Sequence, residues 1–543
     1  MPYAAPLEFT AAPARATLAA GARGRLPAGT FLRAAQTATD RRAVPFLHLR
    51  RTAHGIVADG DTTFETGHRI AVPGRHPEGV FLSWRWADGV LTIERDAYGL
   101  LPCFVWQHEG GIALSTSLAR LLALGAPAEY DVPGVAAFLA LGWYLGDDTP
   151  FRAIRNLPPA PRLVWRGDGL AAEGAIGLPG QANLTREAAI DAYIDLFRAA
   201  MLRRPPQGRI IASLSGGRDS RHILLEMCRA GWRPDEVVTG ELPAAKASND
   251  LPITRQLCER LGLPHRIVQA PASRFRAELR KNDLTQFNAL EHAWYLPCAT
   301  YLAARAGSLY DGLAGDVLSA GRILADEDLN AMALAGDFDT LAARIVGNGH
   351  RPMFAPQRLR DLLGGRLPWK DMGPLATQRL AADLRRFAGT HRPLTLFRFW
   401  SRTRRCVSLM PLAMAGRGPV TYCPFLDREV FDFLMALPHA LTVGESFHDA
   451  AIHRAFPAMA DIPFSSTPVA VRRRSAGTRR FAAETLLHMA RHGTSPNLDG
   501  AWLAKRLAGM VLHGWTWAEQ GYALPHAIYL MQLHDLASGQ VAA

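Results

Sequence analysis

Residues 215–220 read Ser-Gly-Gly-Arg-Asp-Ser, and this combination of residue types could bind a phosphate group. Glycines let an anion approach backbone N–H groups without a Cβ in the way, and N–H groups at a helix start carry partial positive charge. The hydroxyls of Ser215 and Ser220 would add donors, and Asp219 could hold a cation against the same phosphate oxygens. The segment is not a Walker loop, because it lacks the Gly-x-x-x-x-Gly-Lys pattern.

A buried strand and a helix must position this turn. The apolar residues Ile210, Ile211 and Leu214 precede it, and apolar side chains recur at helical spacing from residue 223 to residue 227. The sequence therefore predicts a strand, a glycine turn and a helix.

The alternation of strands and helices continues after the turn. Residues 236–240 and 265–268 have the composition of short strands, and residues 250–261 between them have the pattern of an amphipathic helix. Such alternation predicts a parallel sheet, and ligands of these sheets bind beyond the carboxyl ends of the strands. Thr239 and Gly240 should therefore lie beside the turn.

A second candidate motif is residues 308–317, Ser-Leu-Tyr-Asp-Gly-Leu-Ala-Gly-Asp-Val. Its apolar start predicts a strand that runs out into Gly312 and Gly315. Asp316 would then reach the same edge of the sheet as the first turn.

These two motifs resemble segments of known ATP-using enzymes. Residues 215–220 resemble the S-G-G-x-D-S pyrophosphate loop of ATPases that form AMP and pyrophosphate, and residues 311–316 resemble the S-G-E-G-S-D segment of the asparagine synthetase family. The resemblance implies ATP and Mg²⁺, with Asp219 and Asp316 holding the metal. The residues that it assigns to ATP binding are Leu214, Ser215, Gly216, Gly217, Asp219, Ser220, Thr239, Gly240, Asp311 and Gly312.

The pattern of residues 91–124 predicts a strand, a turn, two strands and a short helix. It is similar to the end of the glutaminase-type N-terminal domain of asparagine synthetases. Arg95, Asp96, Gly99 and Pro102 occupy the positions of the R-D-x-x-G-x-x-P turn in that domain.

The glutaminase resemblance fails at its nucleophile. Members of the family that hydrolyse glutamine carry a cysteine directly after the initiator methionine, whereas this chain has Pro2 there and its first cysteine is Cys103. An N-terminal nucleophile needs the thiol and the amine on one residue. We therefore expect this domain to be an inactive scaffold.

A third resemblance lies at residues 423–438, which begin Cys-Pro-Phe-Leu-Asp and are similar to the V-P-F-L-D segment and helix of asparagine synthetases. The preceding E-A-R triplet of the family is here residues 420–422, Val-Thr-Tyr. No lysine occurs between Lys370 and Lys505, where amide-forming relatives carry a catalytic lysine. Arg472 and Arg473 are the candidates in that region; they could stabilise phosphate charge but could not act as a base.

Together these features predict an α/β protein of two domains. Residues 1–168 should form an α+β domain like those of N-terminal-nucleophile amidotransferases, and residues 169–184 a linker rich in glycine and alanine. Residues 185–543 should form an α/β ligase domain with a parallel sheet, built like a pyrophosphate-loop ATPase.

Composition sets further limits on this chain of 543 residues. The net charge of +12 comes almost wholly from arginine, and no basic run is long enough to require nucleic acid. The six cysteines form no Cys-x-x-Cys pair, so neither a zinc ribbon nor a disulfide framework is predicted. With no apolar run near the roughly 20 residues of a membrane span, and no signal-like segment, we expect a cytoplasmic protein without a membrane partner.

What the family resemblance implies is an AMP-forming carbon–nitrogen ligase. A carboxylate of a small molecule or peptide would be adenylated by ATP, and ammonia or an amine would then attack it to form an amide. Family members that form internal amides, such as lactam-forming synthetases and lasso-peptide cyclases, also lack the N-terminal cysteine. This similarity favours a biosynthetic tailoring enzyme, acting as a homodimer or with a partner biosynthetic protein.

Two other classes stay open at this stage. A tRNA-modifying enzyme could adenylate a base with the same loop, although the resemblances at residues 100–168 and 423–438 argue against it. A non-catalytic relative kept for interaction is the second, supported by Arg218, Arg221 and the missing lysine.

Overall fold

A computed structural model of the chain describes residues 44–174, 177–241, 246–247, 249–319, 326–348, 362–363, 372–443, 446–465, 469–470, 476–514 and 524–539. Pro2 and the two candidate arginines Arg472 and Arg473 lie outside these ranges. Within them, the chain is a mixed α/β structure with several sheets, as expected from the sequence. No helix in the described ranges has both the length and the apolar character that crossing a bilayer requires.

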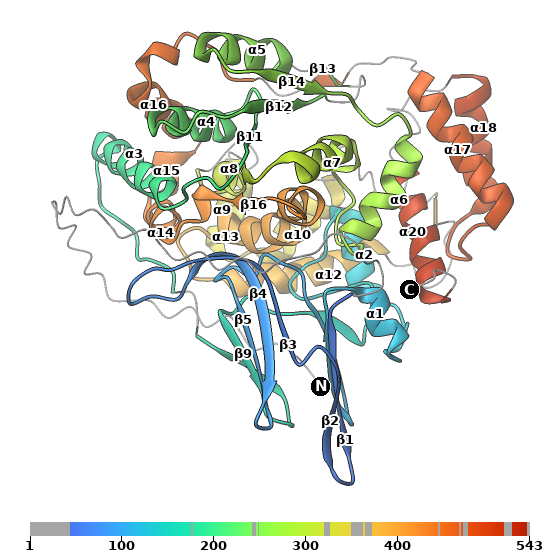
Figure 1. Ribbon diagram of the computed structural model, residues 1–543. Coiled ribbons are helices and arrows are strands. Elements are labelled where there is room, and N and C mark those ends of the chain that lie inside the picture. The colour runs from blue at the N-terminus through green and yellow to red at the C-terminus, as the bar shows by residue number, and fades with distance from the viewer. Residues whose placement is uncertain are drawn as a thin grey trace.

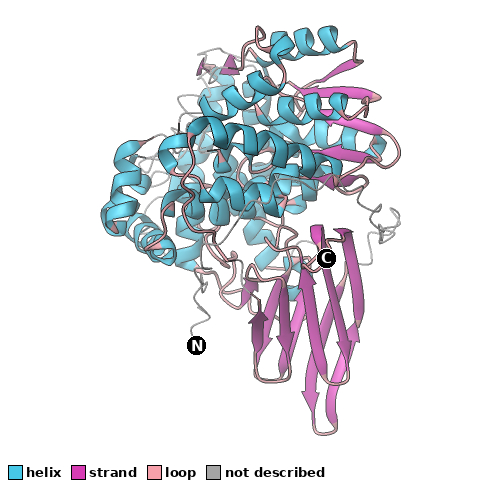
Figure 2. Ribbon diagram, turned by 90° about the vertical axis from the view of Figure 1, so that its left-hand side faces the viewer, coloured by secondary structure: helices cyan, strands magenta, loops and turns pink. Residues whose placement is uncertain are grey.

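The N-terminal part is built from two five-stranded antiparallel sheets, which project below the helices in Figure 1 and Figure 2. One has the order β2-β1-β7-β6-β8 and the other β10-β9-β5-β4-β3. The strands are β1 Phe46–Thr52, β2 Gly55–Gly60, β3 Thr63–Ile70, β4 Glu78–Ala87, β5 Val90–Arg95, β6 Phe104–His108, β7 Gly111–Ser115, β8 Ile154–Asn156, β9 Arg162–Trp165 and β10 Leu170–Glu173.

Tight hairpins and apolar inner faces explain this arrangement. Between β4 and β5 the two-residue turn is Asp88-Gly89, with both residues at positive φ, as a turn that follows the strand twist requires. Buried side chains from both sheets, among them Leu47, Trp84 and Leu163, form one apolar cluster. The sheets are therefore held together by burial of these side chains.

The predicted order of elements in residues 91–124 is confirmed as β5, β6, β7 and the helix α1 (Leu118–Ala123). The helix α2 (Val132–Leu141) follows, capped by the Asp131 carboxylate. The strand β10 falls within residues 169–184, which the sequence suggested to be a linker, and it pairs with β9. The next helix is α3 (Arg186–Leu202), and the Thr185 side chain caps its start by accepting from the Ala188 N–H.

The predicted parallel sheet is confirmed in the C-terminal part, with the order β14-β12-β11-β15-β16 and every pair parallel. It lies at the upper right in Figure 2, with helices packed beside it. Its strands are β11 Ile210–Ser213, β12 Glu236–Gly240, β14 His265–Val268, β15 Ser308–Tyr310 and β16 Val420–Tyr422. The short pair β13 (Lys246–Ala247) and β17 (Val469–Ala470) is antiparallel.

Helices make up most of the remainder. They are α4 Asp219–Arg229, α5 Asp250–Leu261, α6 Arg274–Leu284, α7 Leu296–Arg305, α8 Gly315–Leu318, α9 Glu327–Ala335, α10 Phe338–Asn348, α12 Met372–Leu384, α13 Pro393–Arg398, α14 Arg428–Ala436, α15 His439–Thr442, α16 Ser446–Ala455, α17 Ala476–His492, α18 Gly500–Leu512 and α20 Leu524–Ala537. A π-helical stretch, Phe399–Val407, continues α13.

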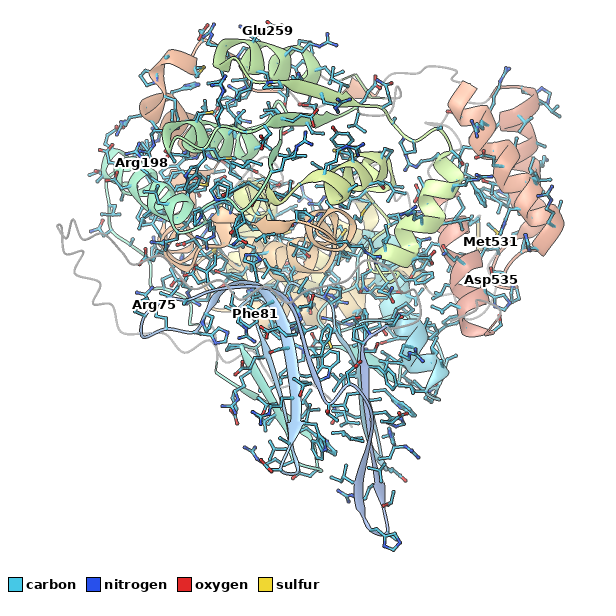
Figure 3. The ribbon with its side chains drawn as sticks, viewed as in Figure 1. Arg75, Phe81, Arg198, Glu259, Met531 and Asp535 are labelled. Carbon is cyan, nitrogen blue, oxygen red and sulfur yellow. The ribbon has the colours of Figure 1, made fainter. Side chains whose placement is uncertain are left out.

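The turn that carries Arg95 is buried between the two parts of the chain. Arg95 is fully buried and donates to the carbonyl oxygens of Gly99 and Leu157, at 2.9 and 3.1 Å. Arg404, from the π-helical stretch, donates to the same two oxygens. The two guanidinium groups therefore join the strands and the helices through shared acceptors. In Figure 3, Phe81 on β4 marks the region where the strands meet the helices, and Glu259 marks α5 at the top of the view.

A second buried junction forms around Asp427, the aspartate of the Cys-Pro-Phe-Leu-Asp segment. Its carboxylate is fully buried and accepts hydrogen bonds from Arg203 and from Arg204, the latter at 2.7 Å. Arg204 also pairs with Glu78 of β4 at 2.8 Å. Burial alone would raise the pKa of Asp427, but Arg204 and Arg203 outweigh burial and lower the pKa to about 2.

We expect Asp427→Asn to lower the free energy of unfolding by about 3 kcal/mol near neutral pH, because it leaves the buried guanidinium of Arg204 and the half-buried guanidinium of Arg203 short of an anion. The pKa of Asp427 is lower in the folded chain than its ordinary value of 3.8. Its contribution should therefore be fully present above about pH 4 and disappear as the pH falls through about 2.

The measurement is urea unfolding of the parent and the variant at several pH values. Glu129→Gln is the matched control, since it breaks an ion pair with Arg152 that is exposed on both sides. A loss for Asp427→Asn no larger than for the control would show that this junction does not stabilise the fold.

Candidate functional site

The Ser-Gly-Gly-Arg-Asp-Ser turn lies at the carboxyl edge of the parallel sheet, between β11 and α4. Leu214 donates its N–H to the carbonyl oxygen of Val238, at 2.9 Å, and the Thr239 hydroxyl donates to the Leu214 carbonyl oxygen, also at 2.9 Å. The strands β11 and β12 therefore end together. This places Thr239 and Gly240 beside the turn, as their positions in the sequence predicted.

Hydrogen bonds inside the turn fix its shape. The Ser215 N–H donates to the Ser220 hydroxyl at 3.0 Å, and the two hydroxyls lie 3.1 Å apart. The Gly217 N–H donates to the Ser215 hydroxyl at 3.3 Å, and the Gly216 N–H donates to the Asp250 carboxylate at 2.9 Å. The turn is thus braced from α5 by a carboxylate that the sequence analysis did not single out.

Asp219 is seated in a cradle made by two glycines of the second motif. A Cβ added to Gly312 would lie 2.6 Å from the Asp219 Cβ, and one added to Gly315 would overlap the Asp219 Cγ. The next residue, Asp316, donates its backbone N–H to the Asp219 carboxylate. Ala314 holds the left-handed conformation, with φ 76°, that turns the chain into this position. The two motifs are therefore in direct contact.

Two carboxyl groups at this place have raised pKa values. Burial raises the pKa of Asp219 well above its ordinary value, and the nearby charge of Asp316 raises it further. Burial also raises the pKa of Asp311 to about 6. The Asp219 side chain keeps 23% of its surface exposed. A cation at this open face would offset the repulsion that Asp219 meets from Asp316 and Asp311.

Two buried histidines extend the cluster beneath Asp219. The Nδ1 atom of His448 lies 3.4 Å from Asp219 Oδ1, and its Nε2 atom lies 3.1 Å from Nδ1 of His222. Burial lowers the pKa of His448 to about 3, and burial also lowers the pKa of His222 well below its ordinary value. Both rings are therefore neutral at pH 7.

An aromatic side chain lies beside Gly240. A Cβ on Gly240 would meet Cys298 at 3.5 Å and the ring of Trp294 at 3.6 Å. Val268, at the end of the neighbouring strand β14, accepts the Glu241 N–H through its carbonyl oxygen at 2.8 Å. The end of β12 therefore presents backbone next to a tryptophan.

The structure brings most of the predicted site residues to one edge of the sheet: Leu214, Ser215, Gly216, Gly217, Asp219, Ser220, Thr239, Gly240, Asp311, Gly312 and Asp316. Arg472 and Arg473 lie outside the described residues. In the described part of the chain, no three His, Cys, Asp or Glu side chains lie together so that they could bind a metal ion. Magnesium sites commonly need only one or two carboxylates, with phosphate oxygens and waters completing the shell.

No family model and no curated protein matches the chain.

We expect Gly312→Ala to lower the free energy of unfolding by about 1–3 kcal/mol, because the added methyl would overlap the Cβ of Asp219, which cannot rotate away. The measurement is urea unfolding followed by circular dichroism. Gly347→Ala is the matched control, since a Cβ there meets nothing within 4 Å in α10. Equal stability of the two variants would show that the cradle around Asp219 tolerates a side chain.

Proposed function

We propose that the chain is an ATP-dependent ligase that activates a carboxylate as its adenylate, releases pyrophosphate and passes the acyl group to an amine or ammonia. The observation that carries this proposal is the contact between Asp219 and the Gly312–Asp316 turn beside a serine and glycine loop. Hydroxyls, helix-start N–H groups and clustered carboxylates at the end of parallel strands suit a metal-bound pyrophosphate.

The residues of the site support this chemistry in distinct ways. A carboxylate is a poor electrophile until a good leaving group is attached, and a leaving pyrophosphate needs its charge held. Asp219 and Asp316 would hold Mg²⁺, which neutralises that charge. Ser215 and Ser220 would donate hydroxyl hydrogens to the phosphate oxygens. The end of β12, with Gly240 beside Trp294, would receive the adenine.

The N-terminal sheets supply structure in this proposal and no glutaminase activity. Cys103, the first cysteine of the chain, is fully buried, and burial raises the pKa of its thiol to about 12. A thiol of this kind is neither accessible nor ionised at pH 7. Ammonia or an amine would therefore come from outside the chain or from the acyl substrate itself.

Asp219→Asn should reduce pyrophosphate release at least about 100-fold, because the variant keeps the shape of the side chain but loses the charge that holds the metal. The assay measures pyrophosphate from ATP and magnesium in the presence of pools of carboxylates and small peptides. Asp195→Asn is the control, since this carboxylate on α3 is 80% exposed.

Release that depends on one pool and is lost only in Asp219→Asn would support the ligase and identify its acyl substrate. If no pool gives pyrophosphate and the parent chain binds no ATP, the ligase proposal is wrong. A non-catalytic role would then account for the chain.

Glutamine should not serve as the nitrogen donor. We expect no glutamate to form when the protein is incubated with glutamine, with or without ATP and magnesium, because the thiol of Cys103 is fully buried and its pKa is raised to about 12. Chromatographic detection of glutamate tests this. Glutamate that appears with the parent and disappears with Cys103→Ala would contradict the assignment of Cys103 to packing.

A further inference from the structure

The glycine loop is enclosed by a second segment, residues 446–465, which comprises α16 and the turn after it. The N–H of Ser465 donates to the Gly216 carbonyl oxygen at 2.8 Å. A Cβ on Gly216 would lie 2.8 Å from the Ser465 Cβ. In Figure 1, α16 lies next to α4, the helix that begins at Asp219. The end of the segment therefore rests directly on the first glycine of the loop.

Arg218, in the middle of the loop, is bound by a carboxylate of this segment. Its guanidinium donates from Nε and Nη2 to the two oxygens of Asp449, with Nη2 and Oδ2 at 2.9 Å. The two side chains are only 16% and 28% exposed. A bidentate pair at this depth is both directional and weakly screened. The positive charge of Arg218 is therefore compensated by Asp449.

Arg221 makes a parallel connection one helical turn further on. Its guanidinium is fully buried and donates to the carbonyl oxygens of Ile462 and Pro463, at 2.7 and 2.6 Å. The guanidinium carbons of Arg218 and Arg221 also lie over the ring of Phe464, at 4.6 and 4.1 Å from its centre. Both arginines of this region are thus directed toward residues 446–465.

His448, the neighbour of Asp449, contacts the neighbour of Arg218. Its ring is fully buried, with Nδ1 3.4 Å from Asp219 Oδ1. Among the described residues this Nδ1 atom has no hydrogen-bond partner. Two adjacent residues of α16 therefore face two adjacent residues of the loop.

We propose that residues 446–465 hold the serine and glycine loop in the shape that binds an anionic polyphosphate, and that Asp449 is the positioning residue, since it fixes Arg218 within that loop. This inference rests on the proposed function, since it assigns roles around the same loop. Arg218 then fastens the loop to α16 and is not itself a phosphate ligand. The binding of polyphosphate depends instead on the N–H groups at the start of α4, the hydroxyls and the metal.

The test measures the dissociation constants of magnesium pyrophosphate and MgATP by calorimetry, for the full chain and for Asp449→Asn, Arg218→Gln and the double variant. We expect each single variant to weaken pyrophosphate binding about tenfold, and the double variant to be no weaker than either, because the two residues act as one unit. Asp449→Glu should restore most of the affinity, since it keeps the charge.

Arg454→Leu is the matched control. It breaks an ion pair that ties α16 to Glu187 and Asp191 of α3 without touching the loop. The thermal midpoint should fall less for Arg454→Leu, whose partners are exposed, than for Asp449→Asn, and only Asp449→Asn should change the dissociation constants. Loss of affinity in the control as large as in Asp449→Asn would reduce the role of Asp449 to holding the helix, and would overturn the inference.

The remaining outcomes separate this inference from the proposed function. Unchanged or tighter pyrophosphate binding by Asp449→Asn, with the parent binding normally, would make Arg218 a phosphate ligand and overturn the inference alone. A parent chain that binds neither pyrophosphate nor MgATP would overturn the proposed function and the inference with it.

Discussion

Buried guanidinium groups need hydrogen-bond acceptors, and in the described part of this protein several of these acceptors lie on distant segments of the chain. Arg95 and Arg404 share the carbonyl oxygens of Gly99 and Leu157, and Arg221 uses those of Ile462 and Pro463. Elsewhere the acceptor is a carboxylate, as at Asp427. Some of the arginines that give the sequence its positive charge therefore join segments inside the fold. This weakens the case that the charge serves to bind nucleic acid.

The candidate site also depends on contacts between segments that are far apart in the sequence. Parallel strands bring the serine and glycine loop and the Gly312–Asp316 turn to one edge, and two glycines let Asp219 approach that turn. Burial raises the pKa of both Asp219 and Asp311 at this edge. Carboxyl groups with pKa values raised in this way mark a candidate functional site.

Sequence reasoning succeeded where the signal is local. Apolar spacing and glycine turns predict the strand, turn and helix around residues 210–227 and the hairpins before residue 124. These signals are local, because residues close together in the chain determine them. It missed Asp250, His448 and Asp449, because their roles arise from contacts with residues far away in the chain. It also missed β10, whose residues Leu-Ala-Ala-Glu have no alternation and become a strand by pairing with β9.

The shared carbonyl oxygens at the Arg95 turn also bear on how the protein comes apart. Separating the sheets from the helices would remove the acceptors of Arg404. It would also expose the apolar surface where Tyr98 packs against Phe399 and Phe431. The stability of each part is therefore coupled to that of the other, because unfolding either part exposes contacts that the other part buries. The antiparallel sheets therefore supply part of the interior on which the helical part packs.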